Sequence, residues 1–194
     1  MKKIDYLRKH LKEGRVYRRE DLNAWSKSVD RHLQQLVSEG VLDKLAGGLY
    51  YAPYMTAIGK APPKEQTLLR CFLKDKRFLI MSPNYYNTLG VGTTQLYNDM
   101  WVYNYKRHGE FEFGEMTYNL VKKQYIPREI TQEFLLVDMV NNINYLAEDV
   151  PDLLSRIERR SLQMNKVKLL RLAHLTGTVA TKKFFNNILN YKDG

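Results

Sequence analysis

The strongest constraint on the fold is a helical periodicity that leads directly into a glycine-containing hairpin. Four apolar residues recur at the spacing of one helix face, Val29, Leu33, Leu36 and Val37. Ser26 or Ser28 is placed to cap the start of this helix, and Gly40 stands where it would end. Next, VLDKL and LYYA flank Ala46, Gly47 and Gly48. Because a Gly-Gly pair supplies the positive φ angles of a tight turn, we expect a hairpin there.

Two shorter segments with helical spacing precede this helix. Ile4, Leu7 and Leu11 share one face of the first, which closes at Gly14, and the second spans RREDLNAW. Three helices followed by a hairpin is the order of a winged helix-turn-helix. In that fold the third helix enters the major groove of DNA and the hairpin lies along the backbone.

The face of the third helix opposite its apolar stripe carries side chains of the kind that read DNA. Arginine pairs with guanine, glutamine with adenine, and serine with a base or a phosphate. Arg18 and Arg19 are placed to hold the backbone, whereas Asp30 would repel phosphate. The candidate DNA-binding residues are Arg18, Arg19, Lys27, Ser28, Arg31, Gln34, Gln35 and Lys44. The alternatives are a winged helix that binds protein and a solvated helix face without a role.

The positive charge of the chain is concentrated at its two ends. The 194 residues carry 31 Lys plus Arg against 21 Asp plus Glu, a formal charge of +10. Residues 1–57 hold +4, residues 58–155 hold −1 and residues 156–194 hold +7. An excess of positive charge points first to nucleic acid, and its asymmetry predicts two separate basic surfaces.

The second basic surface is predicted on the last helices. It comprises Arg156, Arg159, Arg160, Lys168, Arg171, Lys182 and Lys183. The three arginines share one side of a helix, and Lys168 and Arg171 lie three residues apart on the next. Such a surface could contact DNA, RNA or an acidic partner, or it could be a solvated face.

A stretch rich in proline and glycine, YMTAIGKAPPK, predicts a domain boundary near residue 57. We expect a winged helix-turn-helix DNA-binding domain over residues 1–57 and an α+β domain over residues 58–194. In the second domain we expect a helix over residues 65–75, a strand in RFLIM, and two or three antiparallel strands between Met100 and Val121, with a turn at His108 and Gly109. A C-terminal helical bundle follows, with helices over residues 131–146, 151–161 and 167–175 and a last one from Thr178.

Enzymatic chemistry has weak support in the sequence, and we expect no catalytic residues, no metal and no cofactor. Glu110 and Glu112 point the same way from a predicted strand, but E-F-E-F is typical of the wet face of a half-buried strand. The GVGTT segment at residues 90–94 lacks the spacing and the lysine of a P-loop. The histidines occur singly, with His32 expected at the surface, and the lone Cys71 is expected in the core.

Composition favours a cytoplasmic protein without a membrane span. One cysteine allows no intrachain disulfide, which suits a reducing compartment. The longest apolar stretches, such as residues 78–81 and 134–137, are far too short to cross a bilayer.

Five segments together resemble the AbiEi antitoxins of bacterial type IV toxin-antitoxin systems, also known from abortive infection. They are SVDRHLQQLVSEGVLDKLAGGLYYAP, IGKAPPKEQTLL, LGVGTTQ, FLLVDMVNNINYL and LLRLAHLTGTVATKKFFNNIL. The resemblance implies an N-terminal winged helix that represses its own operon and a C-terminal antitoxin domain over residues 58–194. It implies a nucleotidyltransferase-like toxin of the AbiEii type as functional partner, and an antitoxin action that does not require a stable complex between the two.

The resemblance places the groove-reading helix at residues 28–39 and the wing at residues 42–52. The wing departs from the family pattern because Lys44 is its one basic residue, with Asp43 beside it and Gly47 where arginine is common. More of the DNA affinity is therefore expected from Arg18, Arg19, Lys27 and Arg31. The C-terminal basic surface gains a further interpretation, antitoxin activity.

The expected function is a DNA-binding transcriptional autorepressor and antitoxin. Its expected target is double-stranded DNA, an inverted repeat in its own promoter. Because one winged helix buries only about 600–1,000 Å², two copies are expected on two half-sites, as cooperative monomers or a weak dimer. The alternative is a stand-alone winged-helix regulator whose C-terminal domain senses a ligand or dimerises.

Overall fold

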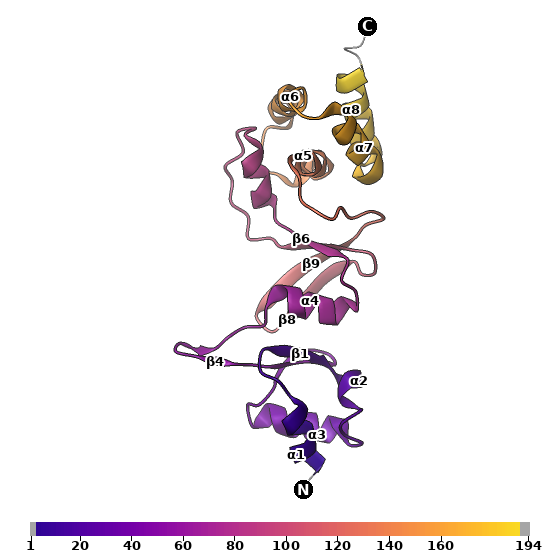
Figure 1. The fold of residues 1–194 in the computed structure, drawn as a ribbon. Helices are drawn as coiled ribbons and strands as arrows, with labels where there is room; N and C mark the ends of the chain where they lie inside the picture. The colour runs from indigo at the N-terminus through magenta and orange to yellow at the C-terminus, as the bar shows by residue number, and fades with distance from the viewer. Residues whose placement is uncertain (1–2, 191–194) are drawn as a thin grey trace. The chain divides into compact units, whose positions relative to one another are not determined.

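The computed structural model describes residues 3–190, which divide into two compact units (Figure 1). Unit 1 extends to Lys76 and includes residues 110–117, and unit 2 contains residues 77–109 together with the chain from Tyr118 onward. Helices and small sheets occur in the chain together, in agreement with the predicted α+β class.

Unit 1 begins with three helices and a three-stranded sheet. Its elements are α1 (Lys3–His10), β1 (Arg15–Arg18), α2 (Arg19–Leu22), α3 (Val29–Ser38), β2 (Asp43–Ala46) and β3 (Leu49–Ala52). The helices and the β2–β3 hairpin lie where the periodicity predicts them, and Gly48 in the turn has a φ of 72°. Strand β1 was not predicted; it pairs antiparallel with β3, which gives the order β1-β3-β2.

The helices of unit 1 pack around one small apolar core. Leu7 of α1, Leu22 of α2, and Leu33 and Leu36 of α3 are fully buried. Tyr17 of β1 packs into the same cluster. Burial of these side chains supplies most of the stability of such short helices, because an isolated helix of this length is marginal in water. The core therefore determines which face of α3 remains exposed.

Unit 1 continues well past the predicted boundary at residue 57. After the β4 (Met55–Thr56) and β5 (Gly59–Lys60) hairpin, α4 (Glu65–Leu73) packs against β1. Leu68 and Leu69 of α4 are fully buried, and the Tyr51 hydroxyl donates to the Ala61 carbonyl at 2.9 Å. These contacts hold residues 58–76 to the N-terminal sheet, so the prolines before α4 do not separate two domains.

The tip of the β8 (Gly109–Phe113) and β9 (Met116–Lys122) hairpin also belongs to unit 1. The rings of Phe111 and Phe113 lie 5.1 and 4.7 Å from that of Phe72, and the Gly114 amide donates to the Leu45 carbonyl at 3.0 Å. The turn predicted at His108 and Gly109 lies where the chain reverses before β8, and Gly109 has a φ of 115°. The hairpin turns after Phe113 because Gly114, with a φ of 64°, supplies the left-handed conformation.

The sheet to which β9 belongs is mixed, which corrects the predicted antiparallel sheet. Its order is β6-β7-β9-β8, with β6 at Phe78–Met81 and β7 at Trp101–Asn104. Strand β6 is antiparallel to β7, but β7 and β9 are parallel, with Trp101 opposite Asn119. The reason is that β8 carries the chain back, so β9 runs in the direction of β7 and pairs beside it.

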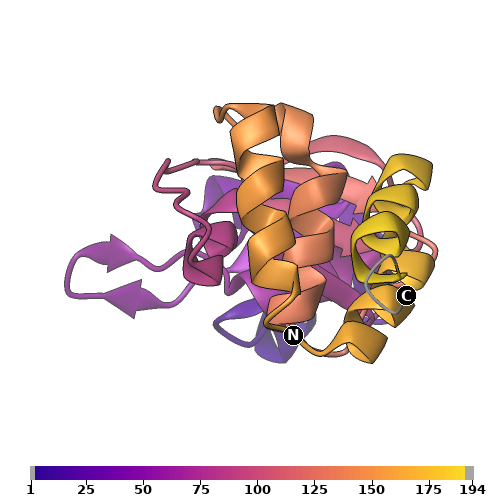
Figure 2. The same ribbon diagram turned by 90° about the horizontal axis from the view of Figure 1, so that it is seen from above.

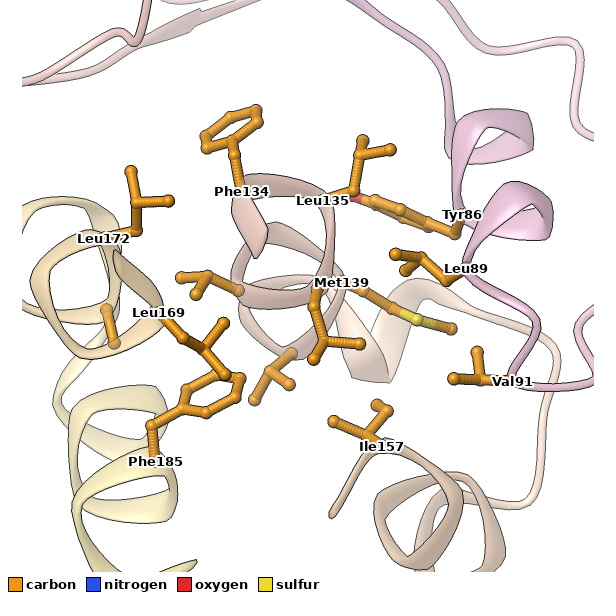
Figure 3. Close-up of a cluster of buried hydrophobic side chains, with 14 of the residues drawn as sticks. Tyr86, Leu89, Val91, Phe134, Leu135, Met139, Ile157, Leu169, Leu172 and Phe185 are labelled. Atoms are coloured by element: carbon orange, nitrogen blue, oxygen red, sulfur yellow. The ribbon is translucent and has the colours of Figure 1, made fainter. Parts of the chain in front are cut away.

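The helices of unit 2 surround α5 (Gln132–Asn141). Every residue from Phe134 to Val140 is buried, which requires neighbours on all sides. Figures 2 and 3 show α6 (Val150–Ser161) on one side of α5, and α7 (Lys166–Thr176) and α8 (Val179–Asn190) on the other. Leu169 and Phe185 contribute fully buried side chains to this cluster.

The ends of α5 agree only in part with the prediction. Thr131 caps the helix as expected, since its hydroxyl oxygen accepts from the Phe134 amide at 3.3 Å. The helix ends at Asn141 rather than Leu146, and a short 3-10 helix, η2 (Ile143–Tyr145), replaces its last turn. A second 3-10 helix, η1 (Pro83–Leu89), packs against α5 from the side of β6.

The loop after η1 is fastened to α6 by one arginine. Arg156 donates to the Val91 carbonyl at 2.7 Å and forms ion pairs with Asp152 at 3.0 Å and Glu148 at 3.7 Å. Gly92 has a φ of 79°, and a Cβ there would lie 2.3 Å from the Arg156 guanidinium. The backbone conformation therefore favours glycine, and a larger residue would in addition push the Arg156 guanidinium away from Val91.

We predict that Gly92→Ala destabilises the protein more than Gly90→Ala. Both glycines have positive φ, which costs an alanine about 1–2 kcal/mol. Gly90 has open space around it, whereas at Gly92 the new methyl displaces Arg156 from Val91, a loss of about 1 kcal/mol or more. Urea unfolding of both variants measures the difference. Equal losses of unfolding free energy would contradict the role of Arg156.

Candidate nucleic-acid interface

Helix α3 presents one buried and one exposed face. Val29, His32, Leu33 and Leu36 are buried. The opposite face exposes five of the predicted DNA-binding residues, Lys27, Ser28, Arg31, Gln34 and Gln35, the first two in the turn that precedes the helix. The predicted face of α3 is thus available to a partner along its whole length.

The turn before α3 is held by a buried histidine and a buried serine. His32 is only 4% exposed, so its predicted surface position is wrong; it lies three residues after Val29 and shares the apolar face. Its Nδ1 lies 2.7 Å from the Ser26 hydroxyl oxygen, which accepts from the Ser28 amide at 3.2 Å. The Ser28 side chain makes no capping hydrogen bond. The start of α3 is therefore set by Ser26 through His32.

Two of the predicted backbone-binding arginines are engaged by carboxylates. Arg19 donates twice to Asp30 at 2.5 Å, and these hydrogen bonds lower the pKa of Asp30. Arg18 donates twice to Asp21 at 2.7 Å and also approaches Glu20 at 3.1 Å. Asp30 consequently presents less negative charge to a phosphate than predicted, and the two arginines present less positive charge.

The remaining cations and amides of the face are free to bind. In residues 3–190, the side chains of Lys27, Arg31 and Gln34 have no hydrogen bond or ion pair with the protein. Gln35 donates to Glu39 at 2.9 Å. Lys44 is exposed on β2 without an ionic partner among the described residues, while its neighbour Asp43 pairs with Lys60 at 2.6 Å. Arg31 and Gln34 thus keep their hydrogen-bonding groups available to a partner.

The C-terminal basic residues do not form one surface. Arg156, Arg159 and Arg160 lie on α6, whereas the other four lie on α7 and α8, across α5 from them (Figures 2 and 3). Arg156 is committed to Val91 and its acidic neighbours, and Lys168 pairs with Glu133 at 2.7 Å. Arg171, Lys182 and Lys183 form no ion pair within the described chain. Among the described residues, Arg159 and Arg160 bond only to the neutral Ser155 carbonyl and Gln163 side chain, so cations without a carboxylate partner remain on α6 as well as on α7 and α8.

The residues considered for enzymatic chemistry are dispersed. Glu110 and Glu112 are exposed on β8, and no group of three potential metal ligands occurs within residues 3–190. Burial raises the pKa of Cys71, whose thiol faces the Val16 carbonyl at 3.6 Å. A raised pKa disfavours the thiolate and hence nucleophilic attack.

No helix in the described part of the chain combines the length and the apolar composition needed to cross a membrane.

Comparisons with known proteins bear on the fold. No family model matches the chain, and no curated protein matches its sequence. A solved structure, the "RV2827C protein from Mycobacterium tuberculosis", is similar to 96% of this chain and 74% of that chain, with a TM-score of 0.53 and 14% sequence identity. At that identity the similarity concerns the fold alone. The arrangement of elements across nearly the whole chain therefore recurs in another protein.

We predict that Ser26→Ala destabilises the protein and Ser28→Ala does not. Removing the buried Ser26 hydroxyl leaves the His32 ring and the Ser28 amide without their partner, at a cost of about 1–3 kcal/mol. Ser28 is exposed and makes no capping bond, so its alanine variant should stay within about 0.5 kcal/mol of the wild type. Urea unfolding measures the free energy of unfolding of both variants. If Ser26→Ala is as stable as the wild type, the Ser26 hydroxyl does not hold the turn before α3.

Proposed function

We propose that unit 1 is a winged helix-turn-helix that binds DNA through α3. The observation that carries the proposal is the unpaired, exposed set of Lys27, Arg31 and Gln34 on a helix that a hydrophobic core holds rigidly. The order α1-β1-α2-α3-β2-β3 and the sheet order β1-β3-β2 support the same fold. Arginine and glutamine on such a helix are suited to bidentate contacts with guanine and adenine.

The distribution of ion pairs supports different proposed roles for the basic residues. Arg31 and Gln34 would read base edges, and Lys27 and Lys44 would contact phosphates. Arg18 and Arg19 would act mainly by holding α2 and α3, because each already has a carboxylate partner. The engagement of Asp30 by Arg19 removes a negative charge that would otherwise repel the DNA backbone.

The proposed target is an inverted repeat in the promoter of the protein's own gene, which would make the protein an autorepressor. A single winged helix contacts too little DNA for high specificity, so two copies would occupy two half-sites about one helical turn apart. These copies would bind as cooperative monomers or as a weak dimer.

The proposed role of unit 2 is antitoxin activity against a nucleotidyltransferase-like toxin. Its support is the similarity of LGVGTTQ, FLLVDMVNNINYL and LLRLAHLTGTVATKKFFNNIL to AbiEi antitoxins. The free cations Arg171, Lys182 and Lys183 on α7 and α8 are the surface residues best suited to this role. The alternative, a stand-alone regulator whose second domain senses a ligand, is favoured by a small pocket in unit 2 that is described in the next subsection.

We predict that Arg31→Ala weakens binding to the promoter repeat by about 1–3 kcal/mol while binding to unrelated DNA changes little. The reason is that a bidentate contact to guanine discriminates between sequences. Arg70→Ala, at an exposed arginine of α4, is the matched control and should bind as the wild type does. Mobility shifts at two salt concentrations measure both variants. Equal losses of affinity for the promoter repeat and for unrelated DNA would show that Arg31 does not read bases.

The antitoxin role can be separated from repression in the full chain. Expressed from a foreign promoter, wild type and Arg31→Ala should both restore growth to cells that carry the product of a neighbouring nucleotidyltransferase-like gene. The double charge reversal Lys182→Glu and Lys183→Glu should restore growth less, because it inverts the free charge of α8. Growth assays in the three strains measure the outcome. If the wild type fails to restore growth, the protein is better explained as a stand-alone regulator.

A further inference from the structure

A single buried carboxylate interrupts the apolar surface of α5. Asp138 is 1% exposed and stands between Val137 and Met139, which are fully buried. Removing an ionised carboxylate from water costs several kcal/mol unless strong hydrogen bonds replace the lost hydration. The side chain therefore needs partners that the surrounding segments must supply.

Two tyrosines and an asparagine supply them. The Tyr86 hydroxyl donates to Asp138 at 2.8 Å, and the Tyr103 hydroxyl lies 2.9 and 3.0 Å from its two oxygens. The amide nitrogen of Asn142 lies 3.1 Å from the Tyr86 hydroxyl, 3.3 Å from that of Tyr103 and 2.8 Å from the Asp138 carbonyl. Burial raises the pKa values of Asp138, Tyr86 and Tyr103. The network thus fixes the positions of Tyr103 and Asn142.

Tyr103 and Asn142 also line a pocket on the face of the sheet. In the parallel pair of β7 and β9, Trp101 lies opposite Asn119 and Tyr103 opposite Val121. Alternate residues of a strand share a face, so Trp101, Tyr103, Asn119 and Val121 line one side of a cavity of about 200 Å³, with Lys123 following. Asn142 and Tyr145, which follow the end of α5, line the other side. We call this cavity the sheet-face pocket.

The polar groups of the sheet-face pocket are arranged for an anionic ligand with hydrogen-bonding edges. Lys123 is half-buried, with its ammonium 4.3 Å from the centre of the Tyr103 ring, and it has no ion pair within residues 3–190. Because its nitrogen is engaged by the network, Asn142 offers its carbonyl oxygen as an acceptor. Asn119 is exposed and can donate or accept.

The aromatic groups of the pocket suit a planar ring. Trp101 and Tyr145 meet edge to face, with centroids 5.1 Å apart, and Tyr145 is 47% exposed at the mouth. Burial, together with the nearby Asp99 carboxylate, raises the pKa of Tyr145 to about 12. The Tyr145 ring is neutral at physiological pH and can stack on a planar group.

We propose that the sheet-face pocket binds a nucleoside monophosphate, with the base against Tyr145 and Trp101 and the phosphate on Lys123. The volume is below the ~300–1,000 Å³ of pockets that enclose whole drug-sized ligands, so the pocket holds the base while the sugar lies in the open mouth. Asn142 would accept a hydrogen bond from the edge of the base, and Asn119 would donate one to it. The ligand could be a free nucleotide or one unit of a single-stranded RNA, since both offer a base and a phosphate.

This binding is independent of the proposed DNA contact, because every residue of the pocket belongs to unit 2. The full-length protein is titrated calorimetrically with AMP, GMP, CMP and UMP, and with the corresponding nucleosides and inorganic phosphate. At least one monophosphate should bind saturably and about tenfold more tightly than its nucleoside. Lys123→Met should abolish that difference, and Tyr145→Ala should weaken nucleotide and nucleoside alike.

Lys122→Met is the matched control, because Lys122 is an exposed residue that precedes Lys123 and projects from the opposite face of β9. It should bind as the wild type does, and thermal melts verify that all variants are folded. A pentanucleotide RNA is titrated in the same way. If it binds more tightly than the monophosphate and is equally sensitive to Lys123→Met, the ligand is single-stranded RNA. If it binds equally or more weakly, the ligand is the free nucleotide. No saturable binding at millimolar concentrations, or equal affinities in Lys122→Met and Lys123→Met, overturns the proposal.

Discussion

The buried carboxylate of Asp138 constrains the interior of unit 2 more than any other single group. A helix that is buried on all sides can pack against many combinations of apolar neighbours. A buried carboxylate, by contrast, needs hydrogen-bond donors at fixed distances and directions. The donors come from η1 and β7, and the asparagine that ties them together caps α5. The arrangement therefore selects one position for each of three segments, at the expense of a desolvated charge. Hydrophobic packing alone would have been less specific.

In unit 1, ion pairs rather than the number of basic residues decide what α3 offers to a partner. The first 57 residues have a charge of +4, yet the arginines nearest α3 in the sequence are already matched by Asp21, Glu20 and Asp30. Such exposed pairs contribute little to stability, but they orient the side chains and remove them from competition for phosphate. If unit 1 binds DNA as proposed, the dependence of that binding on salt should reflect Lys27, Arg31 and Lys44 more than the formal charge.

The helices of both units could be predicted because helical spacing is a local property that ten or twelve consecutive residues are enough to show. The apolar stripe that identified α3 even contained the information that His32 is buried, since it lies one turn after Val29. Strand β1 could not be predicted in the same way, because a four-residue strand is defined by its pairing with β3, more than thirty residues later. The boundary at residue 57 failed for a related reason: prolines indicate a bend, whereas membership of a domain depends on what α4 packs against.

Two features of unit 2 that were not predicted, the parallel β7–β9 pair and the early end of α5, build the sheet-face pocket. With an antiparallel β7–β9 pair, the strand directions that bring Trp101 and Tyr103 opposite Asn119 and Val121 would be lost. If α5 continued to Leu146, Asn142 and Tyr145 would lie on a regular helix, a full turn apart, and neither would cap its end. A cavity with polar groups at one wall thus arises where regular structure stops and where distant strands meet. Neither event leaves a motif in the local sequence, because both depend on segments that meet only in the folded chain.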